Sequence, residues 1–260
     1  MNDQAVSTEK VVAENDEFRV GEVLSKSIST LMKNVVPMGT TAIIFYSPLL
    51  IFELFFLYQL SVSDVDRDKI ESIYMASNII LWIFLTFLIT AALAYGTLQE
   101  LRGNRVSTGD CLRRGLATVF PVLGVAFLES LGIILGTVAF VLPGVILMAM
   151  WWVAIPVAVI ERPGIIESLK RSAALTKGHR WGIFGLVFLL NTLDKIVGKV
   201  TDNLYEIATT LSEVLAITVL LFLVSTVLAA VSAVTAAVGY YHLRAEKEGI
   251  GVDDIVSVFD

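Results

Sequence analysis

The fold class is decided by the stretch from Arg114 to Glu161, which reads RGLATVFPVLGVAFLESLGIILGTVAFVLPGVILMAMWWVAIPVAVIE. Between these two ends lie 46 residues with one charge, Glu129, and Pro143-Gly144 interrupts the run near its middle. A helix needs about 20 apolar residues to cross the hydrocarbon core of a bilayer. The stretch therefore predicts two membrane spans joined by a tight turn at Pro143-Gly144.

The composition of the whole chain supports burial in lipid. Hydrophobic residues make up 56% and charged residues 17% of the 260 positions, and the mean hydropathy is +0.77. Soluble domains carry about 25% charged residues. A net charge of −6 without a basic stripe argues against nucleic acid as a partner. The single cysteine, Cys111, excludes an internal disulfide, and we interpret it as an inert small side chain.

Gaps between charged residues predict an all-α, polytopic protein with six transmembrane helices. We place the spans at about 37–60, 73–98, 120–141, 145–160, 181–200 and 214–241. The fifth span meets Asp194 after 13 residues, so Lys195 has to extend toward the far headgroups. The first 33 residues lack the apolar core of a cleavable signal peptide. The expected organisation is a disordered tail at 1–17, a membrane domain at 18–242 and a tail at 243–260.

Lysine and arginine placement predicts the orientation. Fifteen basic residues lie on one side of the predicted membrane, and four lie on the other. The fifteen belong to the segments before span one, between spans two and three, between spans four and five, and after span six. Basic residues concentrate in cytoplasmic loops. Both termini are therefore expected in the cytoplasm.

Three cytoplasmic segments resemble one another. They are 23–27 (VLSKS), 111–115 (CLRRG) and 168–172 (SLKRS), and each leads into a span within about a dozen residues. Apolar residues around Leu24 and Leu169 recur at helical spacing, so we predict amphipathic helices that lie in the membrane interface with basic side chains toward anionic headgroups. The pattern indicates a threefold repeat of an interfacial helix followed by a two-span hairpin. Chance similarity between basic helices that precede spans is the alternative.

One region resembles a known family. Its motifs are Leu142-Pro143-Gly144-Val145, Trp151-Trp152-Val153-Ala154-Ile155-Pro156-Val157, Glu161-Arg162-Pro163-Gly164, Ser168-Leu169-Lys170-Arg171-Ser172 and Leu175-Thr176-Lys177-Gly178 with Trp181. In this order they resemble the membrane domain of the bacterial and archaeal glycerophosphodiester phosphodiesterase family and the related, uncharacterised YciC-like membrane proteins. The match covers about a fifth of the chain.

The resemblance implies a fold and a location. It implies a multi-pass protein of a bacterial or archaeal cytoplasmic (inner) membrane. The catalytic barrel that some family members carry is not expected, because 19 residues follow the sixth span. We therefore predict a protein that is not an enzyme.

Four polar residues within the predicted spans are candidates for an intramembrane path for a proton or a polar headgroup. They are Glu53, Glu129, Asn191 and Asp194. Ionisable groups at such depth usually face a bundle interior or a wet cavity. The alternative is that each acid is protonated or hydrogen-bonded, for example to Ser130, and joins helices together.

Basic residues beside the predicted spans are candidate contacts for lipid headgroups. They are Lys26, Arg113, Arg114, Lys170, Arg171, Lys177 and Arg180. With two histidines and one cysteine, a metal site of the usual nitrogen and sulfur type is not expected. No cofactor is predicted either, because the chain lacks a glycine-rich phosphate loop.

Small residues at a spacing of four predict close helix packing. Gly132 and Gly136 form such a pair in the third span, and the sixth span carries the stripe Ser225, Ala229, Ala233 and Ala237. A homodimer face is the alternative. We interpret Pro143 and Pro156 as a turn and a kink. Residues 193–211 predict an extracytoplasmic amphipathic helix after span five.

These features favour a non-enzymatic membrane protein that organises, senses or assists in handling lipids or envelope components. Expected partners are membrane lipids, anionic ones above all, together with a second copy of the chain or another membrane protein. The alternative function is a small transporter or permeation protein that uses Glu53 and Glu129. An intramembrane enzyme ranks third.

Overall fold

The computed structural model describes residues 19–62 and 67–249, and these residues form helices without any strand. The helices are α2 (Val20–Lys33), α3 (Val35–Val62), α4 (Arg67–Leu101), α5 (Thr108–Ala117), α6 (Val119–Ala139), α7 (Val141–Trp151), α8 (Ala154–Ile160), α9 (Ile165–Leu175), α10 (Arg180–Ile207) and α11 (Leu211–Glu248). The predicted tail at 1–17 lies outside the described residues, as do 250–260.

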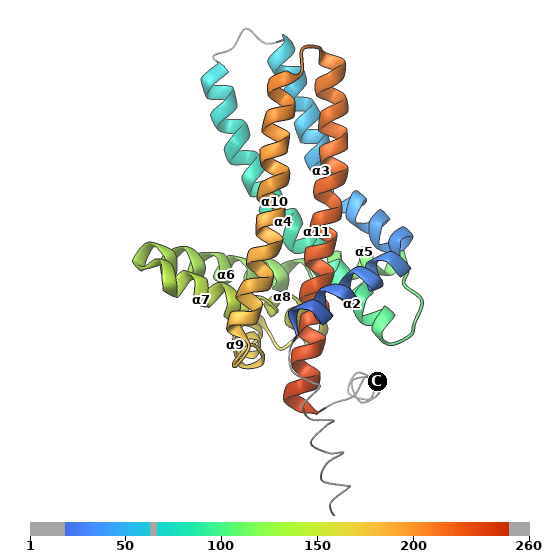
Figure 1. The fold of residues 1–260 in the computed structure, drawn as a ribbon, viewed down its shortest axis with the longest axis vertical. Helices are drawn as coiled ribbons and strands as arrows, with labels where there is room; N and C mark the ends of the chain where they lie inside the picture. Colours follow the sequence, from blue (N-terminus) through green and yellow to red (C-terminus); the bar gives the residue numbers. More distant parts are fainter. Residues whose placement is uncertain (1–18, 63–66, 250–260) are drawn as a thin grey trace, which may run out of the picture.

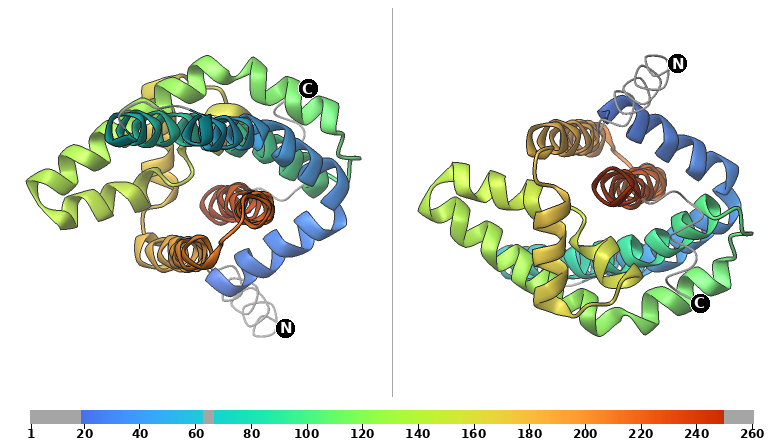
Figure 2. Two further views of the ribbon diagram at one scale, coloured as in Figure 1. Left: turned by 90° about the horizontal axis from the view of Figure 1, so that it is seen from above. Right: turned by 90° about the horizontal axis from the view of Figure 1, so that it is seen from below.

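Four long helices define the long axis of the molecule. Figure 1 shows α3, α4, α10 and α11 running along this axis, whereas the α6–α7 hairpin lies across it in the lower half. Seen end-on in Figure 2, α11 is near the centre, with α10 on one side and α3 and α4 on the other. The shorter helices α2, α5, α8 and α9 gather at the lower end.

Within residues 19–62 and 67–249, five helical segments are long and apolar enough to cross a membrane. They are Val35–Gln59, Ser72–Leu101, Val119–Ala139, Val141–Ile160 and Leu211–Glu248. α10, which carries Asp194, Lys195 and Lys199, is not among them. Large apolar side chains such as Ile80 and Phe127 are about two-thirds exposed on these segments. An apolar outer surface of this kind suits contact with lipid.

The buried core lies at the lower end, around the second half of α11. Every residue from Ala233 to Tyr240 is buried there, whereas most residues between Leu211 and Val224 are exposed or half-buried. α2, α3, α4 and α10 all pack on α11. The long helices are therefore held together mainly below their midpoints.

The turn of the α6–α7 hairpin lies at Phe140, so the prediction of a turn at Pro143-Gly144 was wrong. Phe140 is extended, with φ −168° and ψ 138°, and α7 begins at Val141. Pro143 therefore lies in the first turn of α7, where proline is tolerated because its missing N–H has no partner within the helix. Gly144 serves close packing instead, since a Cβ there would collide with the side chain of Thr137 on α6.

The predicted kink near Pro156 corresponds to a break in the chain. α7 ends at Trp151, and α8 begins at Ala154 after the turn residues Trp152 and Val153. A proline cannot donate to the carbonyl four residues earlier, which here is that of Trp152. All seven residues of α8 are buried. The break therefore turns the chain from the exposed hairpin into the core.

Two boundaries differ from those that the sequence predicts. Residues 193–207 do not form a separate amphipathic helix, because α10 is continuous from Arg180 to Ile207. α11 likewise continues to Glu248, so part of the predicted tail at 243–260 is helical. Neither boundary contains a proline, and helix propensity continues across both.

The three predicted amphipathic helices are present as α2, α5 and α9, and they share one pattern of burial. In each, the first and fifth residues of the similar pentads at 23–27, 111–115 and 168–172 are buried. The fifth residue is always small, which lets the helix approach its neighbour closely. A Cβ on Gly115, for example, would lie 2.9 Å from that of Ala92 on α4.

Candidate functional site

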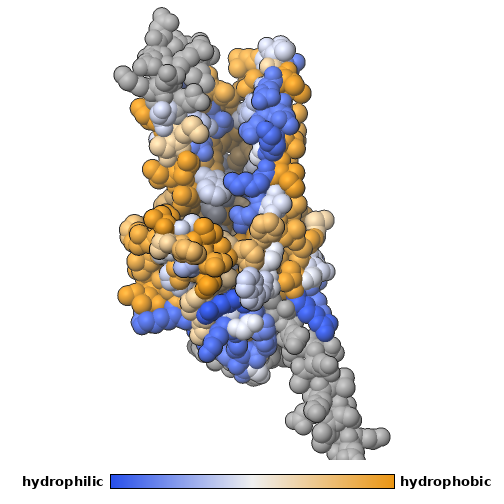
Figure 3. Space-filling model, turned by 60° about the vertical axis from the view of Figure 1, so that its left-hand side comes forward, coloured by the Kyte–Doolittle hydropathy of each residue, from blue (hydrophilic) through white to orange (hydrophobic). Residues whose placement is uncertain are grey.

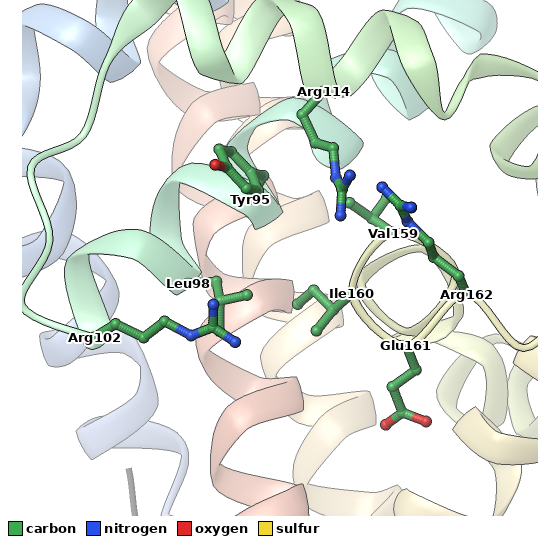
Figure 4. Close-up of a pocket in the computed structure, with 8 residues that line it drawn as sticks. All are labelled: Tyr95, Leu98, Arg102, Arg114, Val159, Ile160, Glu161 and Arg162. Atoms are coloured by element: carbon green, nitrogen blue, oxygen red, sulfur yellow. The ribbon is translucent and has the colours of Figure 1, made fainter. Parts of the chain in front are cut away.

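Three arginines from three elements line one cavity at the lower end of the molecule. Arg102 follows α4, Arg114 belongs to α5 and Arg162 follows α8. The cavity has a volume of about 280 Å³, and its remaining wall is formed by Tyr95, Leu98, Val159, Ile160 and Glu161. Figure 4 shows the guanidinium groups of Arg114 and Arg162 pointing toward each other. We call this cavity the arginine pocket.

Glu161, the acid that lines the arginine pocket, does not face the guanidinium groups of Arg114 and Arg162. Glu161 points away from the three arginines in Figure 4. Its carboxylate accepts hydrogen bonds from Arg171 Nε at 3.0 and 3.2 Å and from the Tyr240 hydroxyl at 2.8 Å, and Arg244 Nη1 lies 3.9 Å away. Glu161 is therefore already paired with cations outside the pocket.

These partners of Glu161 belong to a larger cluster, which we call the α8–α9–α11 lock. Glu248 joins it by pairing with Arg171 and by accepting a hydrogen bond of 2.7 Å from Arg244 Nε. The side chain of Arg244 is only 7% exposed. Because buried charges are tolerated when they are paired and hydrogen-bonded, the lock fixes the end of α8 and the middle of α9 against α11.

Arg114 is held in place by an aromatic ring. Its guanidinium carbon lies 5.5 Å from the centroid of the Tyr95 ring, which is cation–π distance. Its Nε is buried and has no hydrogen-bond partner among the described residues. Buried donors normally have partners, so this nitrogen leaves a donor available for a bound anion.

Arg162 is positioned by an unusual backbone conformation. Its φ is 55°, in the left-handed region that non-glycine residues rarely adopt. The following residue is Pro163, and Gly164 also has a positive φ of 108°. This turn directs Arg162 between the arginine pocket and a second cavity of about 350 Å³. The second cavity is lined by Ala117, Thr118, Pro121, Ala158, Arg162, Gly164 and Ser168.

No family model, curated protein or solved structure matches this chain. The resemblance of residues 142–181 to the glycerophosphodiester phosphodiesterase membrane domain therefore stays a prediction. The chemistry of the site has to be inferred from the site itself.

The residues predicted to contact headgroups have different surroundings. Lys26, Arg113 and Lys177 are exposed. Lys170 is exposed as well and lies 3.5 Å from Glu167. Arg114 lines the arginine pocket and Arg171 belongs to the lock, whereas Arg180 is half-buried at the start of α10. The exposed members of this set all belong to the short helices and turns at the lower end (Figure 1).

The four residues predicted to form an intramembrane path lie on three helices, α3, α6 and α10. Glu53 on α3 accepts a hydrogen bond from the Tyr74 hydroxyl on α4. Glu129 lies on α6, which packs on α4, α7, α8 and α9, and its Oε2 is buried without a partner among the described residues. Asn191 donates to its own helix at the carbonyl of Val187, at 2.8 Å. Asp194 is exposed.

Most of the small residues predicted for helix packing are buried or close to a neighbouring helix, but Ser225 is not. A Cβ on Gly132 would collide with the ring of Trp151, and one on Gly136 would lie 3.1 Å from the backbone nitrogen of Gly144. Gly132 and Gly136 therefore close the α6–α7 hairpin. In α11, Ala233 and Ala237 are buried, Ala229 is half-buried and Ser225 is exposed.

Sequence reasoning missed Arg102 and Arg162 and the pairing of Glu161 with α11. The sequence offers no signal for the conformation of Arg162, because the following Pro163 favours an extended residue before it, whereas Arg162 has a φ of 55°. No local pattern connects Arg102 with Arg162, because 60 positions separate them. The described residues hold no group of three or more histidine, cysteine or acidic side chains that could bind a metal ion.

Proposed function

We propose that this chain is a non-enzymatic integral membrane protein that organises, senses or assists in handling the lipids of the cytoplasmic leaflet. One observation supports the proposal above others. An apolar hairpin and three basic amphipathic helices lie at the same end of the molecule. Figure 3 shows the apolar surface of this region directly above hydrophilic surface. This order matches the layers of one leaflet, acyl chains above headgroups.

The proposed topology departs in part from six spans. In it, α3, α4, α10 and α11 cross the membrane, and the α6–α7 hairpin lies within the cytoplasmic leaflet beside them. α10 crosses although it is charged, because residues 208–210 join its upper end directly to α11. Four crossings keep both ends of the chain in the cytoplasm, as the positive-inside rule predicts. The threefold repeat then has one member, the middle hairpin, that does not cross.

Lipid contact is favoured over transport by the surroundings of the two glutamates. A permeation path through Glu53 and Glu129 needs the two side chains along one route. Glu53 faces α4 through Tyr74, whereas Glu129 lies on α6, which runs across the long helices. The proposal also includes a location in a bacterial or archaeal inner membrane and a second copy of the chain as a partner. It includes the family resemblance as well.

The proposal is tested by measuring which lipids surround the reconstituted protein. The full chain is placed in vesicles of equal parts phosphatidylglycerol and phosphatidylcholine that contain a trace of spin-labelled lipid. We expect enrichment of phosphatidylglycerol around the protein, falling when Lys26, Arg113, Lys170 and Lys177 are all replaced by glutamine. About 1 kcal/mol is expected for each basic residue near an anionic surface. Equal occupancy by both lipids in the unmodified protein would refute the proposal.

A further inference from the structure

We propose that the arginine pocket binds the phosphate of one phospholipid, held more tightly than the lipids that surround the protein. This inference rests on the proposed function, because it requires the lower end of the molecule to face the cytoplasmic headgroups. It adds a defined site with a stoichiometry of one.

The charge of the pocket selects an anion. Three guanidinium groups line a volume of about 280 Å³, and Glu161, the acid among the lining residues, is engaged by Arg171, Tyr240 and Arg244. The guanidinium groups of Arg114 and Arg162 repel each other across this space, and an anion between them offsets the repulsion. The geometry in Figure 4, with Arg114 and Arg162 directed at the same space, places that anion between their guanidinium groups.

The donors of the pocket suit a phosphate. Guanidinium groups present planar pairs of N–H donors that bind phosphate oxygens two at a time. The buried Nε of Arg114 has no partner among the described residues and supplies a further donor. Tyr95 holds this guanidinium from its ring face at 5.5 Å, which leaves the edge of the group available.

The second cavity extends the site in the direction that a lipid requires. It has about 350 Å³, shares Arg162 with the arginine pocket, and includes apolar wall from Ala117, Pro121 and Ala158. Pro121 belongs to the first turn of α6, where the apolar hairpin begins. A phospholipid would place its phosphate between the arginines and its glycerol and acyl carbons along this wall. A free phosphate would leave the second cavity unused.

The test counts lipids retained by the purified full chain. The protein is reconstituted with phosphatidylglycerol, returned to detergent and examined by native mass spectrometry. We expect one retained phosphatidylglycerol per chain. The double variant R114Q/R162Q should retain it about tenfold less, the factor that corresponds to 1.4 kcal/mol. The matched control is R105Q/K33Q, which also removes two positive charges from exposed positions outside the pocket and should retain the lipid.

Further arms separate the alternatives. R114K/R162K keeps the charge but loses paired donors, so intermediate retention is expected, and this variant replaces the glutamine variant if the latter does not fold. Full retention by R114Q/R162Q, or displacement of the lipid by millimolar inorganic phosphate, would overturn the phospholipid site. The four-residue variant K26Q/R113Q/K170Q/K177Q separates this site from the proposed function. If it loses the enrichment of phosphatidylglycerol around the protein but retains the single lipid, the exposed basic residues cause the enrichment and the arginine pocket holds the single lipid.

Discussion

The α10–α11 hairpin and the α6–α7 hairpin each follow a basic amphipathic helix, yet they run in different directions. α10 and α11 have 28 and 38 residues and extend along the molecule, whereas α6 and α7 have 21 and 11 and lie across it. α11 passes unbroken through the core, but the second arm of the middle hairpin breaks at Trp152 and continues as the fully buried α8. The direction of a hairpin is therefore set by how its second arm joins the core.

The largest effect is expected when cysteines placed at the two hairpin turns are labelled, because this tests whether the two hairpins differ in direction. A cysteine at Val141, which is 65% exposed at the α6–α7 turn, should be protected from membrane-impermeant maleimide on both sides of the membrane. A cysteine at Ser212, at the α10–α11 turn, should be labelled fully from outside the cell. The reason is that, in the proposed topology, the α6–α7 hairpin keeps its turn among acyl chains. External labelling of V141C would show instead that α6 and α7 cross the membrane.

The second test removes Glu161, the member of the lock that follows α8 and pairs with both α9 and α11. E161A removes one of the two carboxylates that pair with Arg171 and Arg244, the other being Glu248, and only 16% of the Glu161 side chain is exposed. Breaking a buried ion pair on one side costs about 3 kcal/mol. The free energy of unfolding, measured by denaturant titration in mixed micelles, should fall by this amount.

The control for this variant is E167A. Glu167 is exposed and pairs only with the exposed Lys170 in the described contacts, at 3.5 Å. An exposed pair contributes about 0.5 kcal/mol. A loss of stability in E161A no larger than that in E167A would mean that the lock does not hold α9 in place.

The third test adds one methyl group to a glycine in each hairpin. G144A forces a Cβ into Thr137 and should destabilise the fold by about 2 kcal/mol, the usual cost of overpacking. G198A on α10 meets nothing within 4 Å and should stabilise by about 0.5 kcal/mol through helix propensity. Thermal unfolding of both variants beside the unmodified chain gives the comparison. Equal shifts would show that α6 and α7 are not packed closely.

The contrast between the hairpins also marks what the sequence could predict. Hydropathy located α3, α4 and α11, because 20 or more apolar residues in a row leave few other structures, whereas the uncharged run of α10 meets Asp194 after 13 residues. It could not predict the direction of α6 and α7, since their residues are equally apolar whether a hairpin crosses a bilayer or lies within it. That direction depends on contacts between distant residues, such as Tyr240 and Glu161, which are 79 positions apart.

The candidate site shows the same division between local and distant information. The pentads at 23–27, 111–115 and 168–172 predicted three helices, and their fourth residues are all basic. Yet Lys26 is exposed, Arg114 lines the arginine pocket and Arg171 joins the lock. Equivalent positions have different neighbours because α2, α5 and α9 pack on different helices. A local pattern therefore predicted basic residues at this end of the molecule but not the partners of each.

The smallest labelling is expected at the native cysteine, Cys111. This residue sets the background signal when the two hairpin turns are labelled. Cys111 is fully buried in α5, and burial raises the pKa of its thiol from 9.0 to about 11. Only the thiolate reacts, so at pH 8 its reactive fraction is about a hundredfold below that of an unperturbed thiol. Labelling of the unmodified chain should be negligible at pH 8, rise as the pH approaches 11, and become complete on unfolding. Rapid labelling of the folded chain at pH 8 would show that α5 does not stay packed against α4, and the first comparison would then need a chain with C111A.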